Sequence, residues 1–252
     1  MKYSIILPTY NESENIQETL RKLAQYCPES TEVIVVDDNS PDGTAKIAEQ
    51  VATAINIPVH VLKNPGVRGL SPSVIFGFNH ASGAYLACMD ADGQHRPEDL
   101  PGLLETMERQ DAIFMIGSRH VPGGGFTEHW SLSRTLASRS AAIAARICLG
   151  VPIQDPMSGF FVIRRDIFQF VKDELSPSGF KIMLELAWLL HIAGLQPIEE
   201  YPITFAMRKF GKSKLSAQVI QQYIGMLLRC MRTKASIQKK LKQRLEQSTS
   251  NL

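Results

Sequence analysis

Short apolar runs alternate with amphipathic stretches over the first 116 residues. The runs have the length of strands and lie at residues 3–8, 32–36, 59–62, 84–89 and 112–116. The stretches between them predict helices, and Pro72 and Pro97 suit the first turns of two of these. Strands that alternate with helices predict a mostly parallel sheet covered on both faces. We therefore expect an α/β fold in this half of the chain.

The regular alternation of short apolar runs and amphipathic stretches ends after Gly117. The pattern there predicts a long helix at 131–149, a strand at 161–163, an apolar helix at 180–193 and a strand at 198–205. We expect three parts: residues 1–116 as the first half of a domain, residues 117–214 as the second half of the same domain, and residues 215–252 as a C-terminal helix and basic tail.

Two carboxylates directly follow the fourth apolar run. Asp90 and Asp92 stand two positions apart, and side chains two apart on an extended chain point the same way. We expect both to converge beyond the carboxyl end of the strand, where open α/β sheets bind ligands. Hard oxygen donors there suit Mg²⁺ or Mn²⁺. A plain turn is the alternative interpretation of this sequence.

The loops after the first, second, fourth and fifth strands should open on one edge of the sheet. Apart from the carboxylate pair, they carry Pro8, Tyr10, Glu12, Asp37, Asp38 and Arg119. A nucleotide fits this set, because Asp38 can accept hydrogen bonds from a base, Tyr10 can stack on it and Arg119 can neutralise a diphosphate. The structural alternative is that Asp37 and Asp38 cap a helix and that Glu12 is a solvated first-turn acid.

Composition narrows the class of protein. The chain has 252 residues, and its net charge of +2 is too small to indicate a nucleic-acid partner. The four cysteines are scattered without metal-ligand spacing, which favours a reducing compartment. No apolar run predicts a signal peptide or a membrane span. The phosphate-binding loop of P-loop nucleotidases, the dinucleotide fingerprint and the serine-hydrolase elbow are missing from the sequence.

Four ordered motifs carry a family resemblance. They are Pro8-Thr9-Tyr10-Asn11-Glu12, the stretch from Asp37 to Thr44, Met89-Asp90-Ala91-Asp92 and Gly117-Ser118-Arg119. Together they resemble the inverting nucleotide-sugar glycosyltransferases of family two. Trp130, Arg134, Ser138 and the stretches 155–160 and 208–214 narrow the resemblance to dolichol- or polyprenol-phosphate mannosyltransferases, across roughly residues 3–215.

The resemblance implies an A-type glycosyltransferase fold, Rossmann-like with a mostly parallel sheet, and a C-terminal amphipathic helix. It implies a GDP-mannose donor, a Mg²⁺ or Mn²⁺ cofactor and a dolichyl or polyprenyl phosphate acceptor. The guanosine would lie among Pro8, Tyr10, Glu12, Val36 and Asp38. The metal would be held by Asp90, Asp92 and Gln94, with Ala91 beside the donor. Donor phosphates would be bound by Arg119, Arg208 and Lys214, and the lipid phosphate by Arg119, Arg134 and Ser138.

The implied reaction needs no protein base. A phosphate monoester is largely a dianion near pH 7, because its second pKa is about 6. Catalysis would come from in-line placement and from charge stabilisation of the leaving diphosphate. A single displacement inverts the anomeric centre and gives β-linked mannosyl phosphate. For Asp155 we expect a turn-capping role rather than that of a base.

Three other functions stay open. The sugar could be glucose from UDP-glucose, since this chain reads Leu70-Ser71-Pro72-Ser73 where the family usually has a second glycine and an alanine after Gly69. Lys212 replaces an acid in the later basic loop, which makes the acceptor side more basic. A non-catalytic subunit could retain the fold, although the intact Asp90 and Asp92 argue against it. A nucleotidyltransferase would need a glycine-rich basic loop after the first strand, where this chain is acidic.

The C-terminal region allows two interpretations. Residues 216–231 predict a helix with one apolar stripe, and several basic residues follow it, which suits an anionic membrane surface. The alternative is a core-packing helix followed by a solvated polar tail from about Lys234. We expect a peripheral protein on the cytoplasmic face of a membrane, with or without a small membrane partner subunit.

Overall fold

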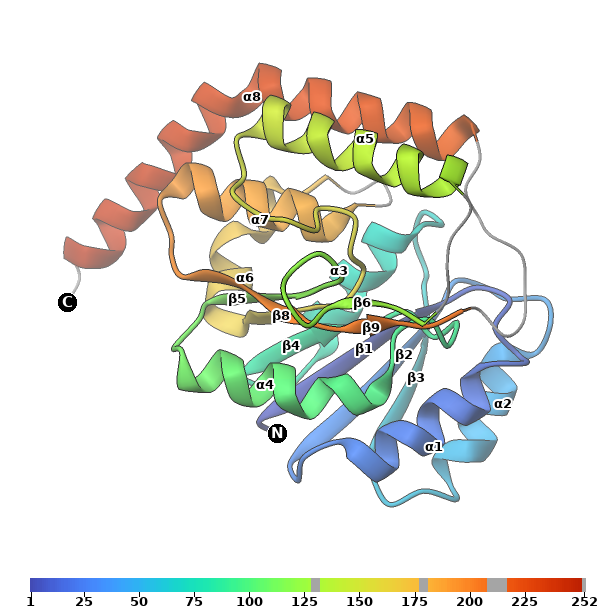
Figure 1. The fold of residues 1–252 in the computed structure, drawn as a ribbon. Helices are drawn as coiled ribbons and strands as arrows, with labels where there is room; N and C mark the ends of the chain where they lie inside the picture. The colour runs from blue at the N-terminus through green and yellow to red at the C-terminus, as the bar shows by residue number, and fades with distance from the viewer. Residues whose placement is uncertain (128–131, 177–180, 208–216, 251–252) are drawn as a thin grey trace.

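The computed structural model describes residues 1–127, 132–176, 181–207 and 217–250 (Figure 1). The strands are β1 (Tyr3–Thr9), β2 (Thr31–Asp37), β3 (Val59–Lys63), β4 (Tyr85–Cys88), β5 (Phe114–Ser118), β6 (Gly125–Phe126), β7 (Phe161–Arg164), β8 (Ile198–Pro202) and β9 (Thr204–Phe205). The helices are α1 (Ile16–Tyr26), α2 (Thr44–Ala52), α3 (Leu70–His80), α4 (Leu100–Arg109), α5 (Leu132–Leu149), α6 (Arg165–Val171), α7 (Ile182–Ala193) and α8 (Ala217–Ser250). Short 3₁₀ turns occupy Pro97–Asp99 and Lys172–Glu174.

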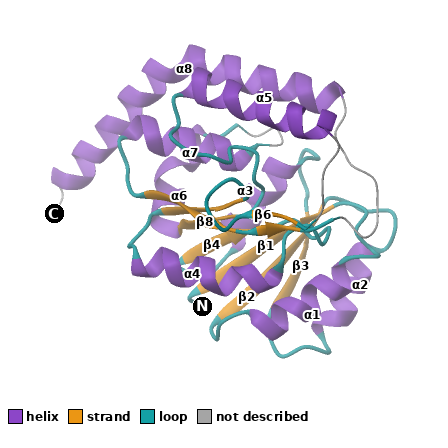
Figure 2. Ribbon diagram, in the orientation of Figure 1, coloured by secondary structure: helices purple, strands orange, loops and turns teal. Residues whose placement is uncertain are grey.

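A seven-stranded sheet with the order β3-β2-β1-β4-β7-β5-β8 forms the centre of the molecule (Figure 2). Only β7 runs antiparallel to its neighbours among these strands. Helices cover both faces, so the predicted α/β fold with a mostly parallel sheet is confirmed. The strands β6 and β9 form a separate small parallel pair.

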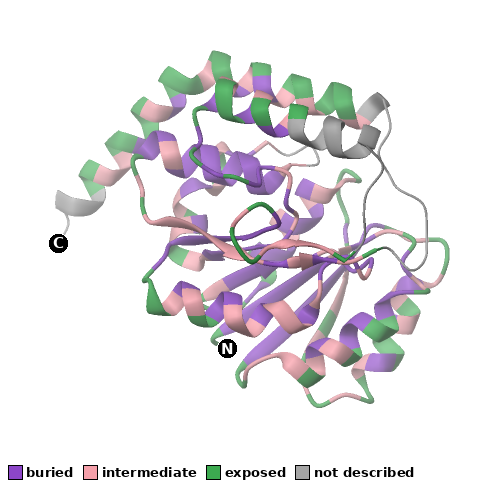
Figure 3. Cartoon of the chain, in the orientation of Figure 1, coloured by how far each residue is buried: buried purple, intermediate pink, exposed green. Residues whose placement is uncertain are grey.

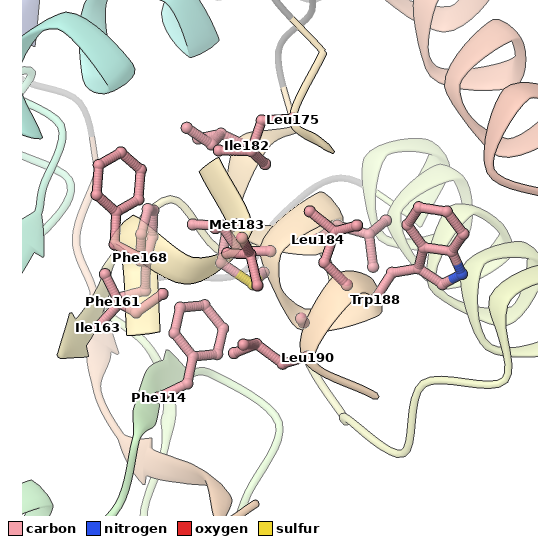
Figure 4. Close-up of a cluster of buried hydrophobic side chains, with 14 of the residues drawn as sticks. Phe114, Phe161, Ile163, Phe168, Leu175, Ile182, Met183, Leu184, Trp188 and Leu190 are labelled. Atoms are coloured by element: carbon pink, nitrogen blue, oxygen red, sulfur yellow. The ribbon is translucent and has the colours of Figure 1, made fainter. Parts of the chain in front are cut away.

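Successive side chains of β1 point into two different cores, which explains why helices cover both faces of the sheet. Ile5 and Leu7 point into a core shared with α1, α2 and α4, whereas Ile6 points into the core on the opposite face. The second core is larger and lies beneath α3, α5, α6, α7 and α8. Its centre is α7, which is buried at eleven of its twelve positions and packs on Phe114, Phe161 and Phe168 (Figure 4). A helix that is apolar all round is stable only in such a position.

The expected single strand at 198–205 is wrong in detail. The chain leaves the large sheet after Pro202, which has no N–H to donate to a further ladder bond. Ile203 lies between the two sheets: its N–H donates to the Ser118 carbonyl (3.0 Å), and its own carbonyl accepts from Gly125 (3.0 Å). Gly125 and Phe126 therefore form a strand that pairs with Thr204 and Phe205.

One part of the alternative interpretation of the C-terminal region, a solvated tail from about Lys234, is also wrong. Helix α8 continues to Ser250, and Ile237 and Leu241 are buried in the larger core. Arg244 contacts Glu174 (3.2 Å) and Asp173 (3.7 Å), which fixes the second half of the helix to the body of the protein. Local polarity misled the prediction, because two apolar residues four apart are enough to dock a helix whose other faces are solvated (Figure 3).

Candidate active site

The loops after β1, β2, β4 and β5 open on the same edge of the sheet, as predicted. Strand order reverses between β1 and β4, because β1 is followed along the chain by β2 on its other side. In open α/β sheets, the crevice at such a point is where ligands bind. The predicted site residues of the first half therefore surround the expected position.

The loop after β4 carries the carboxylate pair. The strand ends at Cys88, and Gly93 turns the chain with a φ of 76° in the left-handed region. Asp92 is buried and accepts a hydrogen bond from the Gln94 N–H (3.0 Å). Asp90 is 37% exposed at its side chain. The Gln94 amide donates to the Ala206 carbonyl (3.3 Å), which leaves its oxygen as a potential ligand.

His95 and Gly159 support this loop, and the sequence analysis missed both roles. The imidazole is buried, accepts a hydrogen bond at Nδ1 from the Asp90 N–H (3.1 Å) and lies 3.6 Å from Asp90 Oδ2. An acceptor Nδ1 places the proton of the neutral ring on Nε2. A Cβ at Gly159 would lie 2.9 Å from Asp90 Oδ2. The absence of a side chain at this position therefore leaves space for the Asp90 carboxylate.

Arg119 is held in a buried ion pair with Asp155. The guanidinium donates from Nε and Nη2 to the two carboxylate oxygens, at 2.7 Å each. The Arg119 N–H also donates to the same carboxylate (3.0 Å). Burial alone would raise the pKa of Asp155, but the hydrogen bonds and charge of Arg119 hold it below the ordinary value. The expected turn-capping role of the Asp155 side chain is therefore wrong: it orients Arg119, and the rings of Phe126 and Phe205 lie 5.6 and 4.9 Å from the guanidinium.

At the β1 and β2 end, Asp38 is the best-placed residue for a base. It is largely buried, and it accepts from Asn64 Nδ2 (3.0 Å) and from the Gly69 N–H (2.9 Å), so it ties the loop after β3 to the site. Asp37 instead accepts from the Ser40 N–H (2.9 Å) and hydroxyl (2.6 Å), so it stabilises the loop before α2 and does not cap that helix, whose N-cap residue is Gly43. Val36 is fully buried in the core.

The side chains of Tyr10 and Glu12 already form contacts within the protein. The Tyr10 hydroxyl accepts from Arg68 (3.2 Å), whose guanidinium carbon lies 4.2 Å from the ring centroid. Glu12 is buried and accepts from Asn15 Nδ2 (2.9 Å). Pro8 is partly buried, and Ala91 is buried with its carbonyl accepting from Thr19 (3.3 Å). A base that stacks on Tyr10 must share the ring with Arg68.

Four predicted phosphate ligands cannot be located. Arg208 and Lys214 lie outside the described residues. Arg134 and Ser138 belong to α5, but the description does not extend to their side chains.

The donor atoms at the β4 loop fit a hard divalent cation. Two carboxylates and one amide oxygen are the ligand types that Mg²⁺ and Mn²⁺ prefer, and such ions commonly complete their shell with water and substrate phosphates. Within the described ranges no group of three or more His, Cys, Asp or Glu could hold a metal ion. A divalent cation here would therefore need Asp90, Asp92 and Gln94 together with phosphate oxygens from a substrate.

Comparison with known proteins identifies the family. A sequence model of Glycosyl transferase family 2 matches residues 4–171. The dolichol-phosphate mannosyltransferase of Pyrococcus furiosus is 39% identical over 245 residues, which cover 96% of this chain and 67% of that protein. The protein of the same name from Saccharomyces cerevisiae is 40% identical over 238 residues, which cover 90% of this chain and 86% of that protein.

Solved structures support the same fold. The mannosyltransferase PcManGT of Pyrobaculum calidifontis, in complex with GDP-Man and Mn²⁺, aligns with a TM-score of 0.66 at 18% identity over 90% of this chain and 64% of that chain. Glucosyl-3-phosphoglycerate synthase of Mycobacterium tuberculosis, in complex with Mn²⁺, UDP-Glc and phosphoglyceric acid, aligns with a TM-score of 0.65 at 19% identity, covering 90% of this chain and 79% of that chain. The sheet order, the carboxylate loop after β4 and these matches together show that the chain is a member of glycosyl transferase family 2.

Proposed function

We propose that the protein transfers mannose from GDP-mannose to a dolichyl or polyprenyl phosphate, with inversion at the anomeric carbon. The observation that carries the proposal is the gathering of Asp38, the Asp90–Gln94 loop and the Arg119–Asp155 pair at one sheet edge, in a chain 39–40% identical to two dolichol-phosphate mannosyltransferases. Under this proposal residues 1–116 bind the donor, residues 117–214 bind the acceptor and residues 215–252 complete the lipid side.

The donor base would meet Asp38. Guanine presents two N–H donors on one edge, and a carboxylate accepts both, since its oxygens carry about four lone-pair positions in total. Asn64 and the Gly69 N–H use two of these positions and hold the carboxylate in place. Pro8, Tyr10, Glu12 and the main chain of Val36 would contact the rest of the nucleoside.

The diphosphate would lie at the β4 loop. A divalent cation held by Asp90, Asp92 and Gln94 would supply charge that offsets the negative charge of the leaving diphosphate. His95 holds the main chain of Asp90 in place through its Nδ1. Arg119 would face phosphate oxygens with the donors that Asp155 does not use, and Arg208 and Lys214 would add charge there.

The acceptor phosphate would attack directly. Since it is a dianion near neutral pH, no group of the protein has to remove a proton from it. Asp155 is not suited to act as a base, because its carboxylate is engaged by Arg119 and its pKa is lowered. The protein's part is to hold the lipid phosphate in line with the anomeric carbon, with Arg134 and Ser138 as further candidate ligands.

The lipid side would rest on a membrane. No described helix is long and apolar enough to cross one. Exposed apolar residues gather instead on two neighbouring helices: Ile143 and Ile147 on α5, and Ile220, Ile224, Leu228 and Met231 on α8. Arg232, Lys234 and Lys239 are exposed on α8 near this patch, and an apolar face beside basic residues suits an anionic surface. We propose peripheral binding at the cytoplasmic face; a small membrane partner subunit could share the same patch.

The test of the activity offers labelled GDP-mannose and labelled UDP-glucose in parallel, with a polyprenyl phosphate, Mn²⁺ or Mg²⁺ and detergent. We expect lipid-soluble label from GDP-mannose. Label from UDP-glucose alone would favour the glucosyltransferase alternative, and label from neither would favour a non-catalytic subunit.

The metal role has its own variant. Asp92→Asn keeps an oxygen that can accept from the Gln94 N–H but removes the charge. We expect transfer to fall by at least about a hundredfold, because a charged ligand at the leaving group is lost. Unfolding by heat should stay close to wild type, since the residue lies in a loop. Unchanged transfer with Asp92→Asn would remove the metal from the proposal.

A further inference from the structure

A cavity of about 220 Å³ lies beneath α8. Its walls come from the start of α3, the beginning of α7 and one face of α8. Its lining includes Ser71, Lys181, Glu185, Val219, Tyr223 and Met226. Part of the wall is apolar and part is charged, which is the character expected of a pocket for a ligand with both kinds of surface.

The charges in this cavity do not cancel. Glu185 is buried and forms an ion pair with Arg229, so these two charges offset each other. The Glu185 carboxylate also accepts from the Ser176 N–H (2.7 Å). Lys181 forms no hydrogen bond or ion pair with the residues that the structure describes. Of the charged residues in the described lining, two are basic and one is acidic, so their formal charges leave a positive excess.

Lys181 also belongs electrostatically to the candidate active site. Burial lowers the pKa of this lysine, Arg119 lowers it further, and Asp90 and Asp155 act in the opposite direction. These influences place Lys181 in the electrostatic neighbourhood of Arg119, Asp90 and Asp155. Because Asp155 offsets the charge of Arg119, a further cation near Arg119 would strengthen the binding of a dianion.

We propose that Lys181 binds the phosphate of the lipid acceptor and positions it for attack, with the first part of the lipid chain in the cavity beneath α8. The inference rests on the proposed function and adds to it a residue that no sequence motif indicated. Val219, Tyr223 and Met226 offer the apolar wall that an isoprenoid chain needs. The ammonium offers a point charge with three donors for the phosphate oxygens.

Two other roles for Lys181 lead to different measurements. A ligand of the donor diphosphate would change the affinity for GDP. A purely structural residue would change the stability of the fold and neither affinity. Lys181→Met keeps the long unbranched stem and removes the charge, whereas Lys181→Arg keeps the charge. Lys46→Met, on the exposed side of α2, is the matched control.

The experiment measures binding to the full chain by calorimetry, with three probes: farnesyl phosphate, farnesol, and GDP with Mn²⁺. We expect Lys181→Met to weaken the binding of farnesyl phosphate by at least about tenfold while GDP binding changes less than about twofold, because a charge-assisted hydrogen bond is lost at the acceptor alone. Lys181→Arg should recover part of the affinity, and Lys46→Met should match wild type. In turnover assays Lys181→Met should raise KM for the lipid without raising KM for GDP-mannose.

Several results would overturn the proposal. They are weaker GDP binding with farnesyl phosphate unaffected, equal affinity of Lys181→Met and wild type for farnesyl phosphate, and no binding of farnesyl phosphate by wild type. Binding that is equally strong for farnesol would also contradict it, because then the charge plays no part. If wild type binds farnesyl phosphate through Lys181 but transfers no sugar, the proposed function fails and the assignment of Lys181 stands.

Discussion

At the scale of single residues, the ion pair of Arg119 and Asp155 fixes the position of a side chain in the candidate site. Both side chains are buried, and the guanidinium is fixed at two of its nitrogens. A planar, doubly bonded arginine can present its remaining donors in one direction only. Under the proposed function, Asp155 would therefore act on the reaction through the orientation of Arg119.

We expect Asp155→Asn to lower the free energy of unfolding by about 3–5 kcal/mol, because a buried arginine charge is left without its partner. Transfer activity should fall as well. Urea unfolding measures the first effect. Asp166→Asn is the control, since the Arg164–Asp166 pair is exposed at the surface and should contribute less than about 1 kcal/mol. Equal losses in the two variants would contradict the buried-pair account.

The same pair predicts how stability depends on pH. The pKa of Asp155 is lowered in the folded protein, so its contribution to stability is fully present above the ordinary carboxyl value of 3.8 and is lost as the pH falls through the lower folded value. Stability curves measured between pH 5 and the acid limit should therefore fall more steeply for wild type than for Asp155→Asn. Parallel curves would rule out this linkage.

Gly159 gives a second test at this scale. A Cβ there would press on Asp90 Oδ2 at 2.9 Å and on His95 Cε1 at 3.1 Å. We expect Gly159→Ala to raise the Mn²⁺ concentration needed for half-maximal activity by about tenfold or more, because small displacements of a ligand weaken metal binding. Gly125→Ala, where nothing lies within 4 Å of the added carbon, should show no such change.

At the scale of elements, α8 has two different halves. The first half borders the cavity and carries exposed apolar residues, whereas the second half docks through Ile237 and Leu241 and through Arg244. We expect Leu241→Ala to cost about 2–5 kcal/mol of unfolding free energy, as for other fully buried leucines. The exposed neighbour Lys242→Ala should stay within about 0.5 kcal/mol of wild type. A small effect of Leu241→Ala on the unfolding free energy would indicate that the second half of α8 is a solvated tail.

At the scale of the whole molecule, the face built by α5 and α8 lies opposite the helices α1, α2 and α4 (Figure 1). The two helices are in contact, and the Tyr223 hydroxyl donates to the Ala141 carbonyl (2.6 Å). Exposed apolar side chains stand on both helices, and Figure 3 shows exposed positions along each of them. This arrangement would bring a lipid phosphate from a membrane to the sheet edge without a spanning segment.

We expect the double variant Ile147→Asp and Ile224→Asp to bind anionic vesicles at least about tenfold more weakly, because two apolar contacts are lost and two negative charges face the surface. Vesicle cosedimentation measures this. Val67→Asp, at an exposed apolar residue outside α5 and α8, is the control for added charge. Transfer to a short, soluble isoprenyl phosphate should be largely retained. Unchanged vesicle binding would contradict a membrane role for this face.

The sequence by itself determined the alternating strands and helices and the polar residues at the strand ends. Apolar periodicity is a local property, and parallel strands must end at a common edge, so Asp38, Asp90 and Asp92 could be assigned to one site before any coordinates. The motifs were sufficient to indicate the family, since each one stands in a loop at this edge.

Only the tertiary structure decided how the second half completes the site. Strand β7 enters antiparallel between β4 and β5, and this insertion brings Asp155 to Arg119 and Gly159 to Asp90. The packing of α7 and α8 brings Lys181 toward the same carboxylates. No local pattern encodes these contacts, because they join segments that are distant in sequence and depend on how whole elements pack.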